Sequence, residues 1–277
     1  HFNDAAAGDT TTSTSVSTST QTANFTVDQI KDAASRVRGY IESNNQLPSY
    51  VQISTYKVNM PQFLEMLTTA LLQINSGTNN PITMKSFTAP TSPQDNIVVG
   101  QIFKSEYLKI AKDVKNCFEV YGHAPDYAYK TSLGTYMRFE SLVYVYSQIL
   151  NSYNATDILP QFITVNPWKV VSNSSTVFIT TDQIKSAAET VKSYVDTNHT
   201  LPSNVTISGR QISMPQFLKL SVKAIINMES YLNTSVILDS AGAPTNPIEN
   251  ITSGTILNDE FVDIATKIKS YMDSNKK

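Results

Sequence analysis

The sequence predicts a mainly α-helical α+β protein, a tandem array of units that each hold a helix, a short β-hairpin, a second helix and a long connector. Two observations support this prediction. The phrase LPSYVQISTYKVNMPQFL at residues 47–64 returns at residues 201–218 as LPSNVTISGRQISMPQFL, with no insertion or deletion. Prolines and methionines recur every 77 residues, at Pro48, Pro125, Pro202 and at Met60, Met137, Met214. A fixed period of this kind is the signature of a repeat architecture.

The recurrences also set the unit boundaries. We assign a Ser/Thr-rich N-terminal segment to 1–25, repeat units to 26–102, 103–179 and 180–256, and the first helix of a fourth unit to 257–277. The first and third units are the most alike, so the middle unit has diverged. A unit of this size buries only a modest share of its surface, so we expect neighbouring units to stack and share core in an elongated array.

The first helix of each unit is predicted from helical spacing and from its end signals. Ile30, Ala34, Val37 and Tyr40 step by 4, 3 and 3 residues, which places them on one face. Their counterparts recur in each later unit, with Cys117 in the place of Tyr40, so we expect Cys117 to be a small buried hydrophobe. Thr-x-x-Gln capping boxes begin this helix at residues 26–29 and 180–183, and it ends near residues 44–45 and 198.

A hairpin and a second helix follow. VQISTYKVN and VTISGRQIS alternate around a tight turn, where Gly209 offers a positive φ. Pro61 and Pro215 suit the first turn of the next helix. Its predicted apolar stripe is Phe63, Leu67, Ala70, Leu71 and Ile74, and its predicted core residues are Met60, Phe63, Met214 and Phe217. The connector is expected to add an extended segment, with Trp168 as a local packing residue.

Composition excludes several classes of function. Charged residues make up 16% of the chain and the net charge is −2, so nothing indicates a nucleic-acid or acidic-membrane partner. No apolar run is long enough to span a membrane. Cys117 is the one cysteine, and His1, His123 and His199 lack the spacing of metal ligands, so we expect no metal or cofactor.

The N-terminal segment and the glycosylation signals favour an exported protein. The chain begins HFNDAAAGDTTTSTSVSTSTQTAN, which resembles a mature N-terminus leading into a disordered surface stalk. Seven N-x-S/T sites offer possible glycosylation: Asn24, Asn154, Asn173, Asn198, Asn204, Asn233 and Asn250. We therefore expect an extracellular protein at the cell surface.

The repeated phrase resembles the pseudomurein-binding repeat, found on surface proteins and wall-degrading enzymes of methanogenic archaea. LPSYVQISTYKVNMPQFLEML and LPSNVTISGRQISMPQFLKLS match the family's Leu-Pro-x-Tyr-Val-x-Ile hairpin and Met-Pro-x-Phe-Leu helix start. The middle unit, HAPDYAYKTSLGTYMRFESLV, has lost Met-Pro-x-Phe, and Asn204 stands in the third unit where the first two have tyrosine. The resemblance implies non-covalent binding to the pseudomurein wall, through its glycan or its peptide cross-links.

The hairpin and the following helix start are the predicted ligand-binding region. The expected contacts are Tyr50, Tyr56, Asn59, Gln62, Tyr127, Asn204, Arg210 and Gln216. Each has an alternative role: packing for the tyrosines, and capping for the residues at the helix start. A neutral, amide-rich and aromatic face suits sugars and peptide amides, and tethered copies of a weak site raise avidity.

We expect a non-catalytic protein. Family enzymes that cut pseudomurein carry a separate Cys-His-Asp peptidase domain, which this sequence lacks, and Cys117 occupies an expected core position. The favoured function is a wall-binding surface protein or adhesin. The alternative is a structural subunit that self-assembles into an extracellular filament or surface layer through its incomplete fourth unit. The apolar face of that unit's helix would then need cover: Phe261, Ile264, Ala265, Ile268 and Tyr271.

Overall fold

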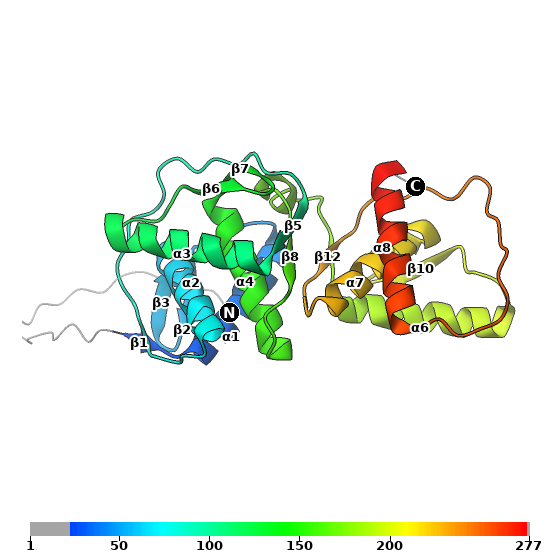
Figure 1. Ribbon diagram of the computed structural model, residues 1–277, viewed down its shortest axis with the longest axis horizontal. Helices are drawn as coiled ribbons and strands as arrows, with labels where there is room; N and C mark the ends of the chain where they lie inside the picture. The colour runs from blue at the N-terminus through cyan, green and yellow to red at the C-terminus, as the bar shows by residue number, and fades with distance from the viewer. Residues whose placement is uncertain (1–22, 276–277) are drawn as a thin grey trace, which may run out of the picture.

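The computed structural model describes residues 23–275 of the 277-residue chain. The stalk prediction concerns mainly residues 1–22, which lie outside this range. The described residues form eight helices and six two-stranded antiparallel sheets, and the small sheets recur in a repeat-like pattern (Figure 1). The predicted fold class is therefore confirmed.

The elements follow the expected order of helix, hairpin, helix and connector. The helices are α1 (Val27–Asn44), α2 (Met60–Ser76), α3 (Lys104–Tyr121), α4 (Phe139–Thr156), α5 (Trp168–Val171), α6 (Thr181–Asn198), α7 (Met214–Glu229) and α8 (Asn258–Asn275). The hairpin strands are β2 (Tyr50–Ile53) with β3 (Tyr56–Asn59), β6 (Tyr127–Thr131) with β7 (Gly134–Arg138), and β10 (Asn204–Ile207) with β11 (Arg210–Ser213).

The first helix of the unit starts and stops where the sequence predicts. Thr26 Oγ1 accepts a hydrogen bond from the backbone N–H of Gln29 at 3.2 Å, and Gln29 Oε1 accepts one from the N–H of Thr26 at 2.9 Å. Thr180 and Gln183 repeat this box at α6. α1 ends at Asn45, whose φ of 54° is the left-handed conformation that commonly closes a helix. The capping signals are thus confirmed.

The hairpin turns and the second helix also form as predicted. Ser208 and Gly209 have φ of 49° and 78°, the positive values that a two-residue hairpin turn requires. Pro61 and Pro215 lie in the first turns of α2 and α7, where a missing N–H leaves no helical hydrogen bond unmade. Phe63 and Phe217 are buried as expected, whereas Met214 is only partly buried. Trp168 is buried in α5.

The middle unit departs from the 77-residue register. Met60 and Met214 are the first residues of α2 and α7, but Met137 lies inside β7, opposite Ala128, and α4 begins only at Phe139. Both strands of this hairpin have five residues instead of the four in the first unit, in an unbroken register, so the helix starts later along the chain. Met137 therefore recurs in the sequence without taking the structural position of Met60 and Met214.

A second small sheet closes each unit. The residues just before the first helix pair with residues that follow the second helix, in β1 (Asn24–Phe25) with β4 (Ile82–Thr83), β5 (Gly100–Phe103) with β8 (Phe162–Val165), and β9 (Phe178–Ile179) with β12 (Val236–Ile237). The extended connector segment is thus confirmed. Phe25 is only 2% exposed, so the first unit includes residues that we had assigned to the N-terminal segment.

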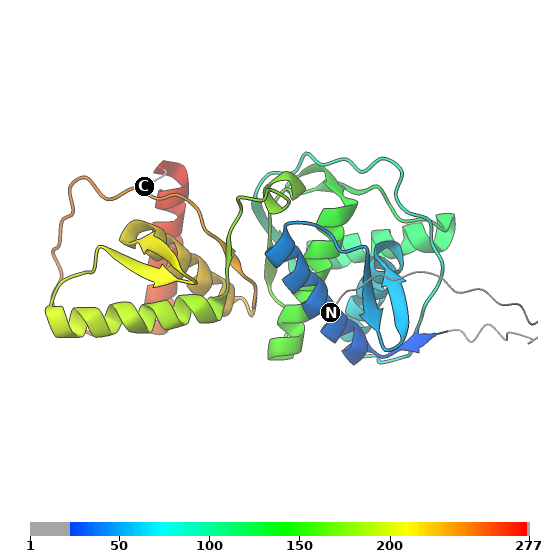
Figure 2. The same ribbon diagram turned by 180° about the vertical axis from the view of Figure 1, so that it is seen from behind.

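The units do not share one continuous core. In the first two units α1 packs on α4, α2 packs on α3, and α2 also packs on α4, so each unit's first helix is covered by the other unit's second helix. Nearly all of this core comes from residues 23–171, whereas a separate core spans residues 179–236. Figures 1 and 2 show the two resulting lobes side by side. The expectation that neighbouring units share core therefore holds for the first two units and is wrong for the third, whose core is separate.

The second lobe is an open version of the first. α7 packs on α8 as α2 packs on α3, but within residues 23–275 no helix takes the place of α4. Leu64 of α2 is fully buried, whereas Leu218, at the same place in α7, is 44% exposed. The uncovered side is a largely apolar hollow of about 1040 Å³ between α6, α7 and α8, here called the C-terminal groove. Its lining includes Val191, Leu201, Phe217, Leu218, Ile268 and Tyr271.

The recurring fourth position of the first helix is not a core position. Tyr40 and Tyr194 are 37% and 42% exposed, and Cys117 is half-buried, so the prediction that Cys117 is a buried core residue is wrong. Partial burial raises the pKa of the Cys117 thiol, and Asp126 raises it further. Three residues beyond Val37, Tyr40 lies at the edge of the apolar stripe rather than at its centre. The periodicity located the face correctly but overestimated its width.

The face of α8 is covered in part by its own chain. Ala265 is buried at 2% exposure through packing of α8 on α7, while Phe261, Ile264 and Tyr271 remain exposed. The expectation that this face as a whole awaits cover from outside is thus wrong for Ala265 and its contact with α7. The exposed part adjoins the C-terminal groove through Tyr271.

Hydrogen bonds join the two lobes. Glu42 of α1 accepts from Ser235 Oγ at 2.7 Å and from Tyr144 Oη at 3.0 Å, and Arg38 lies 3.7 Å away. Burial raises the pKa of Glu42, although Arg38 and the two hydroxyl donors oppose the rise. Nearby, Asn151 Nδ2 donates to the carbonyl of Asn233 at 2.9 Å. Polar contacts of this kind fix the orientation of one lobe on the other.

Candidate functional site

Each hairpin has one face on the core and one face toward solvent. Residues directly opposite each other in an antiparallel pair lie on the same face, so the register sorts the side chains. In the first unit Val51, Ile53 and Val58 are buried. We call the other side the outer hairpin face. It consists of Tyr50, Gln52, Lys57 and Asn59 in the first unit, Tyr127, Tyr129, Tyr136 and Arg138 in the second, and Asn204, Thr206, Gln211 and Ser213 in the third.

The two predicted tyrosines of the first unit lie on opposite faces of its hairpin. Tyr50 is on the outer face, with Lys57 Nζ 4.7 Å from the centre of its ring. Tyr56 is opposite Ile53 on the inner side and packs edge-on against Phe25, with ring centroids 5.8 Å apart. A single ligand on the outer face can therefore touch Tyr50 but not Tyr56.

Three predicted contact residues form capping boxes. Gln62 N–H donates to Asn59 Oδ1, and Asn59 N–H donates to Gln62 Oε1, both at 3.0 Å. Gln62 Nε2 also donates to the carbonyl of Lys85 at 3.0 Å. In the third unit Gln216 Oε1 accepts from both the N–H and the Oγ of Ser213. The amides of both glutamines are thus engaged at the helix starts.

The middle hairpin carries an aromatic cluster that sequence reasoning missed in part. Tyr127 was predicted as a contact, whereas Tyr129 and Tyr136 were not. The ring centroid of Tyr136 lies 4.6 Å from that of Tyr127 and 5.9 Å from that of Tyr129. Tyr129 is 58% exposed, and Lys130 Nζ lies 5.2 Å from its ring centre. Alternation in the stretch Tyr127–Ala128–Tyr129 was the available signal. Exposed rings on one face of a hairpin can stack on the apolar faces of sugars.

The outer face of the third hairpin is polar rather than aromatic. Asn204 is exposed, and Gln211 Nε2 donates to Thr206 Oγ1 at 3.0 Å beside it. Arg210 is exposed but lies opposite Ile207, so it extends from the inner side at the turn. Of the predicted contact residues, the outer faces therefore carry Tyr50, Asn59, Tyr127 and Asn204.

The chain was compared with family models and with curated proteins. Residues 22–53 match the model of the pseudomurein-binding repeat. The match includes α1 and β2, and it overlaps the repeated phrase at residues 47–53. No curated protein matches the chain.

The pseudomurein-binding repeat of the first unit implies association with the pseudomurein cell wall. Its matched residues include Tyr50 of the outer hairpin face. The second and third units share the helix–hairpin–helix order of the first unit, with the longer hairpin in the second. Each of the three units therefore presents one outer hairpin face. Figure 1 shows β2 and β3 low on the first lobe, β6 and β7 at its top, and β10 in the second lobe.

Outside the repeat's hairpins, the described residues add three observations. The asparagines of all seven N-x-S/T sites are exposed. Within residues 23–275 no group of three or more His, Cys, Asp or Glu side chains is arranged to hold a metal ion. None of the described helices is both long and apolar enough to cross a membrane.

Proposed function

We propose that the protein binds pseudomurein without cutting it, and that the outer hairpin faces of its units make the contact. The match of residues 22–53 to the pseudomurein-binding repeat carries this proposal. The outer faces fit the role because they present tyrosine rings, amides and hydroxyl groups. Such groups can hydrogen-bond sugars and peptide amides at little desolvation cost.

Three faces on one chain suit a repetitive polymer. A wall offers many equivalent sites, so binding through one unit raises the effective concentration of the others at neighbouring sites. The faces lie on separate parts of the surface, which favours contacts with different strands of the wall rather than with one strand. An extracellular location follows from this proposal, and the exposed asparagines of the N-x-S/T sites would be accessible to glycosylation there.

A sedimentation assay with purified, protein-free pseudomurein sacculi tests the proposal. We expect most of the protein to pellet with pseudomurein and only background amounts to pellet with bacterial murein or cellulose. Equal retention on all three polymers would contradict specific binding, and retention on none would contradict wall binding altogether.

Self-association is a second candidate function, favoured by the C-terminal groove. In the first lobe, α1 and α2 correspond to α6 and α7 of the second lobe, and α4 packs on both α1 and α2. α4 is the second helix of a repeat unit. α7 of another copy is an element of the same type, and its exposed Leu218 would meet the same apolar hollow. We propose a second copy of this chain as the occupant, because two open lobes can each bury the other's groove.

Sedimentation velocity over a range of protein concentrations checks the association. We expect dimers or larger assemblies to appear with rising concentration, and Leu218→Glu to restore the monomer by placing a charge in the groove. Leu257→Glu, at an exposed leucine that does not line the groove, is the matched control and should associate normally. A chain that stays monomeric at all concentrations would rule out this candidate.

A further inference from the structure

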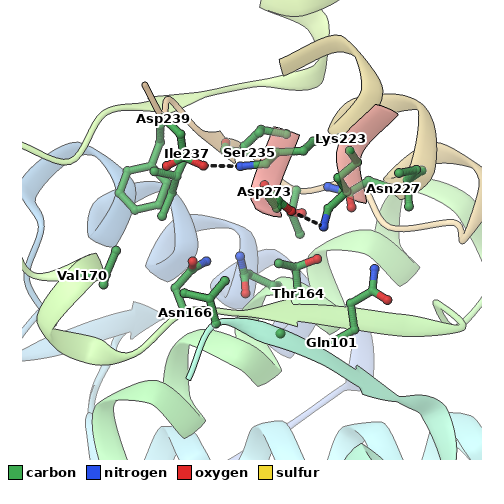
Figure 3. A pocket seen from close by; sticks show the side chains of 18 of the residues that line it. Gln101, Thr164, Asn166, Val170, Lys223, Asn227, Ser235, Ile237, Asp239 and Asp273 are labelled. Carbon is green, nitrogen blue, oxygen red and sulfur yellow. Dashed lines mark hydrogen bonds and ion pairs between the residues drawn. The ribbon is translucent and has the colours of Figure 1, made fainter. Parts of the chain in front are cut away.

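A pocket of about 520 Å³ with both polar and apolar walls lies between the two lobes, here called the interlobe pocket. The first lobe contributes the β5–β8 sheet and α4, and the second lobe contributes α7, β12 and α8. Figure 3 shows Gln101, Thr164 and Asn166 on one side of it, across from Lys223, Asn227 and Asp273. Its volume is in the range of sites that hold a small ligand.

Several polar side chains of the pocket have no partner in the described part of the chain. The side chains of Gln101, Thr164 and Asn166 make no hydrogen bond with residues 23–275. The side chain of Asn227, a residue only 7% exposed, makes no such hydrogen bond either. Gln148 is 4% exposed, and its Oε1 is buried without a hydrogen-bond partner. Leaving a buried polar atom unpaired is costly, so Gln148 Oε1 indicates a ligand that donates a hydrogen bond to it. The other side chains line the pocket and are free to donate to and accept from the same ligand.

The charged groups of the pocket are already paired. Lys223 pairs with Asp239, and Lys269 pairs with Asp273 at 2.9 Å. Lys219 lies just behind them, 3.3 Å from Asp273, so three ammonium groups face two carboxylates. Burial raises the pKa of Asp273, but the neighbouring lysines outweigh it and hold the pKa below its ordinary value. The excess of ammonium groups would therefore repel a cationic ligand, whereas an uncharged polar ligand would not be repelled.

The remaining wall is apolar. Val170, Phe178, Val236 and Ile237 line the pocket beside the unpaired amides. An aromatic ring and branched aliphatic side chains can cover a methyl group or the C–H face of a sugar ring. The combination of unpaired carboxamides, a hydroxyl and an apolar wall matches a ligand with hydroxyl, amide and methyl groups on a small frame.

We propose that the interlobe pocket binds an acetamido sugar, one or two sugar residues long. Gln148 Oε1 accepts a hydrogen bond from its amide or a hydroxyl, and the side chains of Asn166 and Asn227 bond its remaining polar groups. The ligand's source rests on the proposed function, because the amino-sugar glycan of the wall would supply it. The same chemistry could come from the end of a glycan strand or from a released fragment.

Gln148→Leu separates ligand binding from folding. Leucine has a similar volume and removes the unpaired buried oxygen, so we expect the unfolding temperature of this variant to be unchanged or higher. N,N′-diacetylchitobiose, a pair of acetamido sugars, is the probe, titrated into the full chain by calorimetry. Affinity for it should fall at least tenfold in Gln148→Leu and stay unchanged in Gln94→Leu, where the same substitution lies on an exposed connector.

The assay with sacculi keeps the two proposals apart. If the unaltered chain binds sacculi but not diacetylchitobiose, or if Gln148→Leu binds the sugar as well as the unaltered chain does, the pocket assignment is wrong and wall binding stands. If the sugar binds through Gln148 but sacculi are not retained, wall binding is wrong and the pocket assignment stands. Where both hold, release of the chain from sacculi by the sugar indicates a strand end, and unchanged retention indicates a released fragment.

Discussion

Leu64→Ala is expected to lower the free energy of unfolding of the first lobe by about 2–5 kcal/mol, whereas Leu218→Ala should change that of the second lobe by about 0.5 kcal/mol or less. Both leucines occupy the same place in Met-Pro-Gln-Phe-Leu. Leu64 is fully buried because α2 packs on both α3 and α4, but Leu218 is 44% exposed because α7 packs on α8 and has no described helix in the place of α4. A truncated side chain lowers the free energy of unfolding strongly only where surrounding atoms leave a cavity in its place.

Urea denaturation of both variants and of the unaltered chain, at a protein concentration where the chain is monomeric, measures the two losses. The lobes have separate cores, so two transitions can be expected, and the shift belongs to the transition of the mutated lobe. The two substitutions are chemically identical, and each serves as the other's control. Equal losses would mean that α7 is as well covered as α2, which would contradict the open second lobe.

Loss of the middle hairpin's tyrosines should cause the largest fall in wall binding. For the double variant Tyr127→Ala with Tyr129→Ala we expect at least a tenfold weaker affinity for pseudomurein sacculi, because aromatic side chains dominate the energy of most interfaces. These two rings flank Tyr136 on the outer face and are not part of the buried core. The circular dichroism spectrum should therefore stay unchanged.

Tyr121→Ala is the matched control for these tyrosines. Tyr121 is 67% exposed at the end of α3 and lies on no hairpin face, so its loss should leave retention intact. Binding isotherms of the three proteins on the same batch of sacculi give the comparison. If the double variant binds as tightly as Tyr121→Ala does, the middle hairpin is not a contact and the first hairpin would be mutated next, at Tyr50.

Local signals in the sequence predicted the local structure well. Capping boxes located the starts of α1 and α6, alternation around Gly209 located a hairpin, and the prolines at 61 and 215 located the starts of helices. These features depend on residues within a few positions of one another, so a short stretch contains the whole cause. The same reasoning overestimated the burial of Cys117, since spacing alone cannot give the width of a buried face.

Contacts between distant residues could not be predicted in the same way. β1 and β4 are two residues each and are joined only through the folding of the unit between them, so no alternation announces them. The middle hairpin has one more residue on each strand, which shifts the start of α4 while the surrounding period stays intact and conceals the change. The interlobe pocket combines residues from Val99 to Asp273 with no common motif. Its existence depends on how the lobes pack, which no single stretch of sequence encodes.

The reciprocal packing of α1 with α4 and of α2 with α3 has a consequence for copy number. In the first lobe, the first helix of each unit is covered by the second helix of the other unit. If a gene gains a single unit, the first helix of that unit has no such cover, and its apolar face is exposed. A gene that gains two adjacent units adds a complete core and leaves all existing surfaces as they were. Gains and losses in this architecture should therefore be tolerated best in steps of two, and the number of wall contacts should change in the same steps.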